Sequence, residues 1–150
     1  MPAYVAAGAA FLIAVLWFDL MFDVQTRQHA GDTLPSDVLA SISAYYRRVT
    51  TDAKPMGNLV SVVMLLTLLT IVAETMRDTD HPWVPFPPLA AAAAAVGLAA
   101  TRTVTNAKRL GQAKDSPAVQ TTLARKIYRD HMFCLAAMTL VLALQLSAGF

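Results

Sequence analysis

The sequence has one cysteine, Cys134, and only three histidines among its 150 residues. A single cysteine cannot form an intramolecular disulfide or a CxxC pair, so dithiol chemistry such as quinone reduction is excluded. The histidines lie too far apart to face each other across a helical bundle as haem b ligands. A zinc or di-iron site needs several converging ligands. Only Asp19, Asp23 and His131 could begin one, so we expect no metal.

The motifs that mark common enzymes are also missing. The sequence contains no glycine-rich phosphate loop, no GxSxG motif and no HExxH motif. These absences exclude the usual nucleotide-binding sites, the nucleophile elbow and the zinc protease site. We therefore expect no bound cofactor.

Charge is scarce as well. Only 15% of the residues are charged, 56% are hydrophobic, and the mean hydropathy is +0.48, which lies outside the usual range of soluble proteins. Four windows without Asp, Glu, Lys or Arg are each long enough to cross the ~30 Å of a bilayer's hydrocarbon. We predict a single-domain (1–150), all-α membrane protein, a bundle of four transmembrane helices. The expected spans are about 3–22, 56–76, 86–106 and 130–149.

The basic residues divide unevenly between the two ends of the predicted spans. Eleven of the twelve fall on one side and only Arg77 falls on the other. Basic loops stay in the cytoplasm, so we expect a plasma (inner) membrane protein with both termini outside the cytoplasm. The basic residues explain the net charge of +2 without nucleic acid, and they can hold anionic lipid headgroups. The eleven are Arg27, Arg47, Arg48, Lys54, Arg102, Lys108, Arg109, Lys114, Arg125, Lys126 and Arg129.

The predicted cytoplasmic segments carry helices of their own. Ser36 can cap a helix whose apolar residues share one face with basic neighbours. Two interpretations fit this helix equally: an interfacial helix along the cytoplasmic leaflet, or a helix packed on the bundle. The third span continues into the cytoplasm to a C-terminal cap at Gly111, and a helix beginning at Ser116 and Pro117 runs into the fourth span.

Two further features concern the third span and the turn before it. The alanine-rich start of this span allows close approach of neighbouring backbones, so we expect it to be the central, most buried helix. The short turn that precedes it has four prolines and places Trp83 and Phe86 as anchors at the level of the lipid headgroups.

Polar groups from all four spans meet at one predicted membrane depth. Asp19 and Asp23 lie one turn apart on the first span, while Asn58, Arg102, Asn106 and His131 lie at a similar level on the others. An unpaired carboxylate is costly inside hydrocarbon. We therefore expect Asp19 to face the bundle and to meet Arg102. Asp23, Arg109 and Asp130 are interpreted as boundary residues that pair for assembly.

These residues suggest a cytoplasm-facing pocket for a lipophilic small molecule. Asp19 and His131 are the candidate catalytic residues, since either side chain can move a proton. The candidate substrate-binding residues are Arg102, Asn106, Asn58 and Arg129. A purely structural interpretation of Asp19, Arg102, Asn106 and His131 is equally open.

The segments around residues 101–110 and 123–138 resemble the anthrone-oxygenase-like family of small four-helix membrane proteins. The matching positions are Thr105, Asn106, Arg109, Leu110 and His131, in about the last third of the chain. Tyr128 stands near the position of a family Trp, and Cys134 stands where the family has an Arg. A few members of the family are implicated in the oxygenation of polycyclic anthrones, so the resemblance implies a fold more than a reaction. A cofactor-free oxygenase would need only a base such as His131 or Asp19, since the carbanion of its substrate reacts with oxygen.

Two other classes of function remain open beside a small membrane enzyme. One is a subunit of a transporter or channel, which with four spans would have to form a homo-oligomer through the alanine face of the third span. The other is a non-catalytic assembly or lipid-binding protein whose basic cytoplasmic hairpin docks a partner.

Overall fold

The computed structural model describes residues 2–77 and 86–148, and every element in these ranges is helical. Four stretches are long and apolar enough to cross a membrane: Ala3–Gln28, Lys54–Arg77, Phe86–Gly111 and Pro117–Ser147. The predicted anchor Trp83 lies outside the described residues, whereas Phe86 begins a helix. The elements are α1 (Pro2–Asp23), η1 (Val24–Gln28), α2 (Ser36–Arg47), η2 (Arg48–Asp52), α3 (Lys54–Arg77), α4 (Phe86–Leu98), η3 (Ala99–Thr103), α5 (Val104–Gly111) and α6 (Pro117–Ala148).

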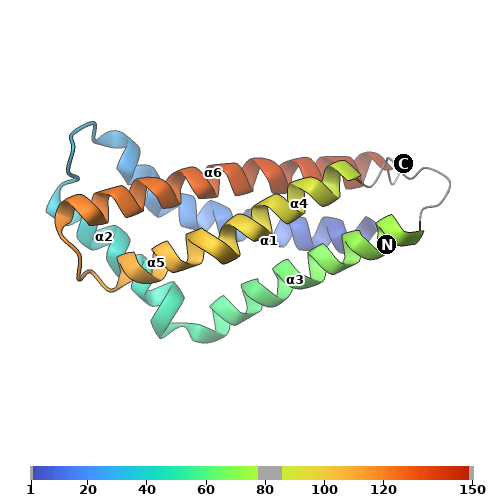
Figure 1. The fold of residues 1–150 in the computed structure, drawn as a ribbon, viewed down its shortest axis with the longest axis horizontal. Coiled ribbons are helices and arrows are strands. Elements are labelled where there is room, and N and C mark those ends of the chain that lie inside the picture. The colour runs from blue at the N-terminus through green and yellow to red at the C-terminus, as the bar shows by residue number, and fades with distance from the viewer. Residues whose placement is uncertain (1, 78–85, 149–150) are drawn as a thin grey trace.

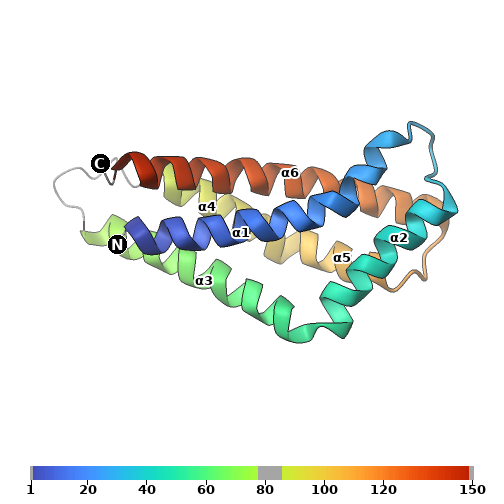
Figure 2. The same ribbon diagram turned by 180° about the vertical axis from the view of Figure 1, so that it is seen from behind.

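The four long helices run along one axis, with both termini at the same end of the molecule (Figure 1). Helix α2 and the connection between α5 and α6 lie at the opposite end. Seen from behind, α1 lies along α6, and α3 diverges from its neighbours toward the α2 end (Figure 2). Buried residues on α3 are accordingly few, namely Thr67 and Ile71.

Helix α6 is the most buried of the four. In an apolar 18-residue segment of this helix 39% of the residues are buried, against 22% in such a segment of Phe86–Gly111. The expectation that the alanine-rich third span is central is therefore wrong. Alanines bring backbones close on the side that packs, such as Ala92 and Ala95, but they do not require neighbours all round.

Helix α2 packs on the cytoplasmic end predicted from the sequence, with its apolar face against α5 and α6. Ile42 and Tyr46 are buried in a cluster with Leu110, Ala124 and Ile127. This face is covered by protein and is not free to lie in lipid. Of the two alternatives for this helix, packing on the bundle is therefore the one observed.

Gly111 ends α5, but it does not act as the predicted left-handed cap. No described glycine has a positive φ, and the left-handed residue is Ala113, with φ 51°. A Cβ on Gly111 would lie 2.7 Å from the backbone nitrogen of Arg47. Glycine is therefore required here because the backbones of α2 and α5 touch.

Two apolar cores succeed each other along α6. One lies among α1, α3, α4 and α6 and includes Leu12, Cys134 and Met138. The other joins α2, α5 and α6 around Ile42 and Ile127. Asp130 and His131 lie on α6 between them, so the polar residues occupy the junction of the two cores.

Candidate functional site

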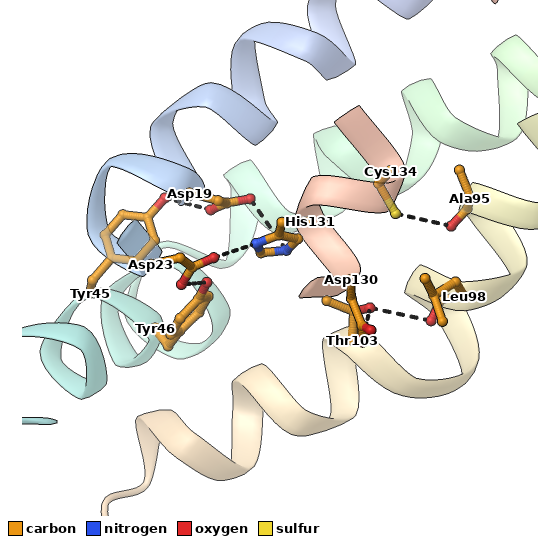
Figure 3. A network of polar contacts seen from close by, with 10 residues as sticks. All are labelled: Asp19, Asp23, Tyr45, Tyr46, Ala95, Leu98, Thr103, Asp130, His131 and Cys134. Atoms are coloured by element: carbon orange, nitrogen blue, oxygen red, sulfur yellow. Dashed lines mark hydrogen bonds and ion pairs between the residues drawn. The ribbon is translucent and has the colours of Figure 1, made fainter. Parts of the chain in front are cut away.

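Five polar side chains from three helices meet at the junction of the two cores (Figure 3). The aspartates are one turn apart at the end of α1, the tyrosines are adjacent on α2, and the histidine comes from α6. We call this group the acid–histidine cluster. Its members are Asp19, Asp23, Tyr45, Tyr46 and His131.

Asp23 is the centre of the acid–histidine cluster. Its side chain is fully buried, with Oδ2 2.7 Å from His131 Nδ1. Its other oxygen accepts a hydrogen bond of 2.6 Å from the Tyr46 hydroxyl. The interpretation of Asp23 as a boundary residue is therefore wrong, because the residues around it remove its carboxylate from any interface.

Asp19 occupies the second position in the acid–histidine cluster. Its Oδ1 accepts a 2.6 Å hydrogen bond from Tyr45, whose ring stacks on Phe22. Its Oδ2 lies 3.8 Å from His131 Nε2, which is an ion-pair distance but too long for a hydrogen bond. Nδ1 of His131 is thus held by Asp23, and Nε2 has no hydrogen bond within the described part of the chain.

Both tyrosines are held in their protonated form by this environment. Burial raises the pKa of Tyr46 well above its ordinary value of 10.0, and the nearby charges of Asp23 and Asp19 add to the effect. Burial also raises the pKa of Tyr45, together with the charge of Asp19 and the hydrogen bond to it. Both hydroxyls therefore remain donors at neutral pH.

Arg102 pairs with Asp130 and not with Asp19, so the expected Asp19–Arg102 pair is wrong. Its Nε donates to Asp130 Oδ2 at 3.0 Å, and its Nη2 donates to Oδ1. Thr103 donates a further 3.1 Å hydrogen bond to the same carboxylate. Asp130 is only 2% exposed, so it too is buried and is not the boundary residue that was expected.

A π-helical turn explains how two adjacent residues reach one carboxylate. Arg102 and Thr103 lie in η3, where the helix between α4 and α5 is locally widened. A regular helix turns about 100° per residue, which points neighbouring side chains apart. The wide turn brings both donors onto Asp130, and such turns occur often at functional sites.

A cavity of about 440 Å³ adjoins the acid–histidine cluster. Asp19, Tyr46 and His131 contribute to its wall, and Lys54 and Lys108 lie at its exposed edge between α3 and α5. The rest of the lining is mostly apolar, including Leu12, Leu16, Val60, Met64, Ala95, Val104 and Met138. The divergence of α3 from the bundle makes room for this space.

The predicted substrate-binding residues are divided between different places. Asn58 lines the cavity, as do the candidate catalytic residues Asp19 and His131. Arg102 and Arg129 line a separate surface hollow on the other side of α6. Asn106 is half-buried and lines neither space.

Arg109 lies apart from all of these residues. It forms two hydrogen bonds of 2.8 Å with Asp115, where the chain passes from α5 to α6. The hydrogen bond and charge of Arg109 lower the pKa of the Asp115 carboxyl. This exposed pair supports the interpretation of Arg109 as a boundary residue.

Sequence reasoning missed the two tyrosines as members of the site. In the sequence, Tyr45 and Tyr46 fall near the apolar face of their helix, and an aromatic ring fits that pattern without any polar role. A signal was nevertheless present: a buried carboxylate needs donors, and the segment between the first two spans contains two adjacent tyrosine hydroxyls.

Metal ligands do not converge in the described residues, where no group of three or more His, Cys, Asp and Glu is arranged to hold an ion.

Glu74 lies toward the other end of α3. Its Oε2 accepts a 3.4 Å hydrogen bond from Gln145, and its Oε1 is buried without a hydrogen-bond partner in the described ranges. Glu74 is therefore not the solvated helix end that its position in the sequence indicates.

Comparison with models of known protein families, with curated proteins and with solved structures found no match. The resemblance to the anthrone-oxygenase-like family stays a prediction.

Proposed function

We propose that this chain is a multi-pass plasma-membrane protein and a small enzyme that removes a proton from a lipophilic molecule. The four long apolar helices support the membrane placement. The eleven-to-one division of the basic residues supports an orientation with both termini outside and the α2 end in the cytoplasm. This orientation opens the cavity near the cytoplasmic leaflet, with α2 packed on the cytoplasmic end of the bundle.

The observation that carries the proposal is the position of His131 in the cavity wall. Nδ1 of His131 is within hydrogen-bond distance of buried Asp23, which favours the tautomer with its proton on Nδ1. Nε2 then presents its lone pair beside the cavity. An imidazole held this way by a carboxylate is the arrangement of a general base, because the carboxylate fixes the ring and stabilises the imidazolium that forms.

The remaining residues of the cavity suit an acidic, mostly apolar molecule. The apolar lining favours a hydrophobic body, while Lys54 and Lys108 at the edge attract a carboxylate or an acidic hydroxyl. Asp19, 3.8 Å from Nε2, can accept the proton from His131 and pass it on. Tyr45 and Tyr46 position the two carboxylates through their hydroxyls.

The reaction class is proton abstraction next to a carbonyl group. A carbanion formed in this way on a polycyclic phenolic ketone can form a C–O bond to molecular oxygen, which is the oxidant. Protonation gives a hydroperoxide, and loss of water with the remaining C–H proton leaves a carbonyl, so no cofactor is needed. Oxygenation of polycyclic anthrones is the activity of a few members of the family that the sequence resembles. The chain's own contribution would be the base, the dry cavity and the orientation of the substrate.

Membrane placement is tested by labelling with a membrane-impermeant maleimide. In a Cys134→Ser background, Asp80→Cys should react in intact cells and Lys114→Cys only after the cells are opened. The reverse pattern would contradict the orientation, and recovery of the protein in the soluble fraction would contradict the placement.

Ligand binding is tested by purifying the protein and identifying co-purifying small molecules by mass spectrometry. Ser61→Trp places a large ring in the cavity lining, whereas Val62→Trp adds the same ring at an exposed neighbour outside it. We expect Ser61→Trp to lose the ligand and Val62→Trp to keep it. Equal ligand content in both variants would show that the cavity is not the binding site.

A further inference from the structure

A second hollow lies on the other side of α6 and shares no lining residue with the cavity. Its walls come from α4, η3 and α6. Three cationic side chains line it, together with one buried carboxylate and three apolar residues. The lining residues are Ala94, Leu98, Arg102, Lys126, Arg129, Asp130 and Phe133.

The positive charge of this hollow exceeds what the protein neutralises. Asp130 balances Arg102, but Lys126 and Arg129 are exposed and form no recorded ion pair or hydrogen bond in the described ranges. Arg102 uses Nε and Nη2 for Asp130, which leaves Nη1 free to donate outward. The hollow therefore presents two unpaired cations beside a fixed guanidinium, an arrangement that a phosphate would stabilise.

The order of residues along the helices distinguishes a lipid from a free anion. Lys126, Arg129 and Phe133 lie on one face of α6, with the two cations toward the cytoplasmic end and Phe133 one turn deeper. On α4, Leu98 and Ala94 follow Arg102 in the same direction. Phe133 is 49% exposed. The hollow thus changes from cationic to apolar with depth, as a phospholipid changes from headgroup to acyl chain.

We propose that this hollow binds one anionic phospholipid of the cytoplasmic leaflet, its phosphate between Arg102, Lys126 and Arg129 and its acyl chain along Phe133 and Leu98. The site rests on the proposed membrane placement and is independent of the proton chemistry in the cavity. The pair of Arg102 with Asp130 has a role in it, because it holds one phosphate ligand in a fixed orientation.

The test is titration of the detergent-solubilised protein with phosphatidylglycerol, followed by native mass spectrometry. Each basic residue near an anionic surface contributes about 1 kcal/mol, or roughly fivefold in affinity. We therefore expect the double variant Lys126→Gln, Arg129→Gln to bind roughly 30-fold more weakly. The matched control Arg48→Gln, Lys114→Gln removes two exposed cations elsewhere and should bind as the wild type does. Phosphatidylcholine should bind weakly to every form.

Two further measurements distinguish binding of a whole phospholipid from binding of its phosphate alone. One uses the variant Phe133→Ala, and the other uses inorganic phosphate as a competitor. We expect Phe133→Ala to weaken binding of phosphatidylglycerol, and inorganic phosphate to be a poor competitor. Equal losses in the two double variants, or no loss in either, would overturn the site. Effective competition by inorganic phosphate would overturn its assignment to a lipid. If the protein has to be extracted from membranes with detergent but shows no selective lipid binding, the site is rejected and the membrane placement still stands.

Discussion

Asp130 and His131 are neighbours in the sequence, yet their side chains point about 100° apart on α6 and meet different partners. Asp130 meets a guanidinium that is always charged. His131 meets two aspartates whose other partners are tyrosine hydroxyls, and no arginine or lysine of the described residues pairs with them. One side of the helix therefore holds a fixed ion pair, and the other holds groups whose charge depends on where a proton resides.

The difference suggests that Asp130 has a structural role and that His131, the next residue on the helix, has a chemical one. A carboxylate neutralised by arginine is a poor proton carrier, because the cation stabilises its charged form. Asp19 and His131 line the cavity, so they can exchange protons with a molecule bound there, and Asp23 holds the histidine from behind. The following predictions test whether the two sides of α6 respond differently to substitution and to pH.

Gly111→Ala should have the largest effect on stability. The added Cβ would meet the backbone of Arg47, which forces α2 away from α5 and carries Tyr46 away from Asp23. We expect a loss of about 1–3 kcal/mol in the free energy of unfolding, with a changed near-ultraviolet circular dichroism of the tyrosines. Gly97→Ala is the control, since nothing lies within 4 Å of its Cβ. Equal stability of the two variants would contradict the close contact of α2 and α5.

Tyr46→Phe and Thr103→Val compare the two sides directly, because each removes one hydroxyl from a buried aspartate. Asp23 loses a donor where no arginine is present, so we expect Tyr46→Phe to cost about 2 kcal/mol. Asp130 keeps Arg102, so Thr103→Val should cost about 1 kcal/mol. Denaturant unfolding in detergent measures both losses. A larger loss for Thr103→Val would reverse the comparison.

High pH should affect the tyrosine side of α6 and not the arginine side. The pKa values of Tyr45 and Tyr46 are raised in the folded protein, so their contribution to stability is complete below pH 10.0 and is lost as the pH rises above it. Tyrosinate absorbance should show a delayed ionisation that Tyr45→Phe, Tyr46→Phe removes. Persistence of the delayed step in that double variant would refute the assignment.

Asp115→Asn should have the smallest effect. The pair of Asp115 with Arg109 is exposed, and such pairs are screened by salt. Because the pKa of Asp115 is lowered, the pair stabilises the fold above its ordinary value of 3.8 and is lost as the pH falls below it. We expect almost no change in melting temperature at neutral pH. A drop as large as that of Tyr46→Phe would mean that the α5–α6 connection supports the cluster.

The helices were predictable from the sequence because hydrophobic length and breakers act locally. The third long helix ends at Gly111 and α6 begins at Pro117, as expected. The depth shared by Asp19 and His131 was also predictable, since the rise per residue places both near one end of their spans. Both residues line one cavity, as expected, although Arg102 and Asn106 were expected at the same depth and do not line it.

The pairing of the charged residues could not be predicted, because depth along an axis leaves rotation about it undefined. Arg102 and Asp19 share a depth, but the π-helical turn in η3 directs Arg102 toward Asp130. The contribution of Tyr46 depended on α2 folding back onto α5, a contact set by the missing side chain of Gly111. Such tertiary contacts leave no periodic signal in the sequence.

The central claim is that His131 removes a proton from a molecule in the cavity, and exchange with heavy water tests it most directly. The purified protein with its co-purified ligand is placed in D2O, and deuterium in the ligand is measured by mass spectrometry. We predict exchange by the wild type and a loss of about 10²–10⁴-fold in its rate for His131→Gln, with Tyr128→Phe unchanged. Exchange at the same rate in His131→Gln, or none in the wild type, would contradict the account.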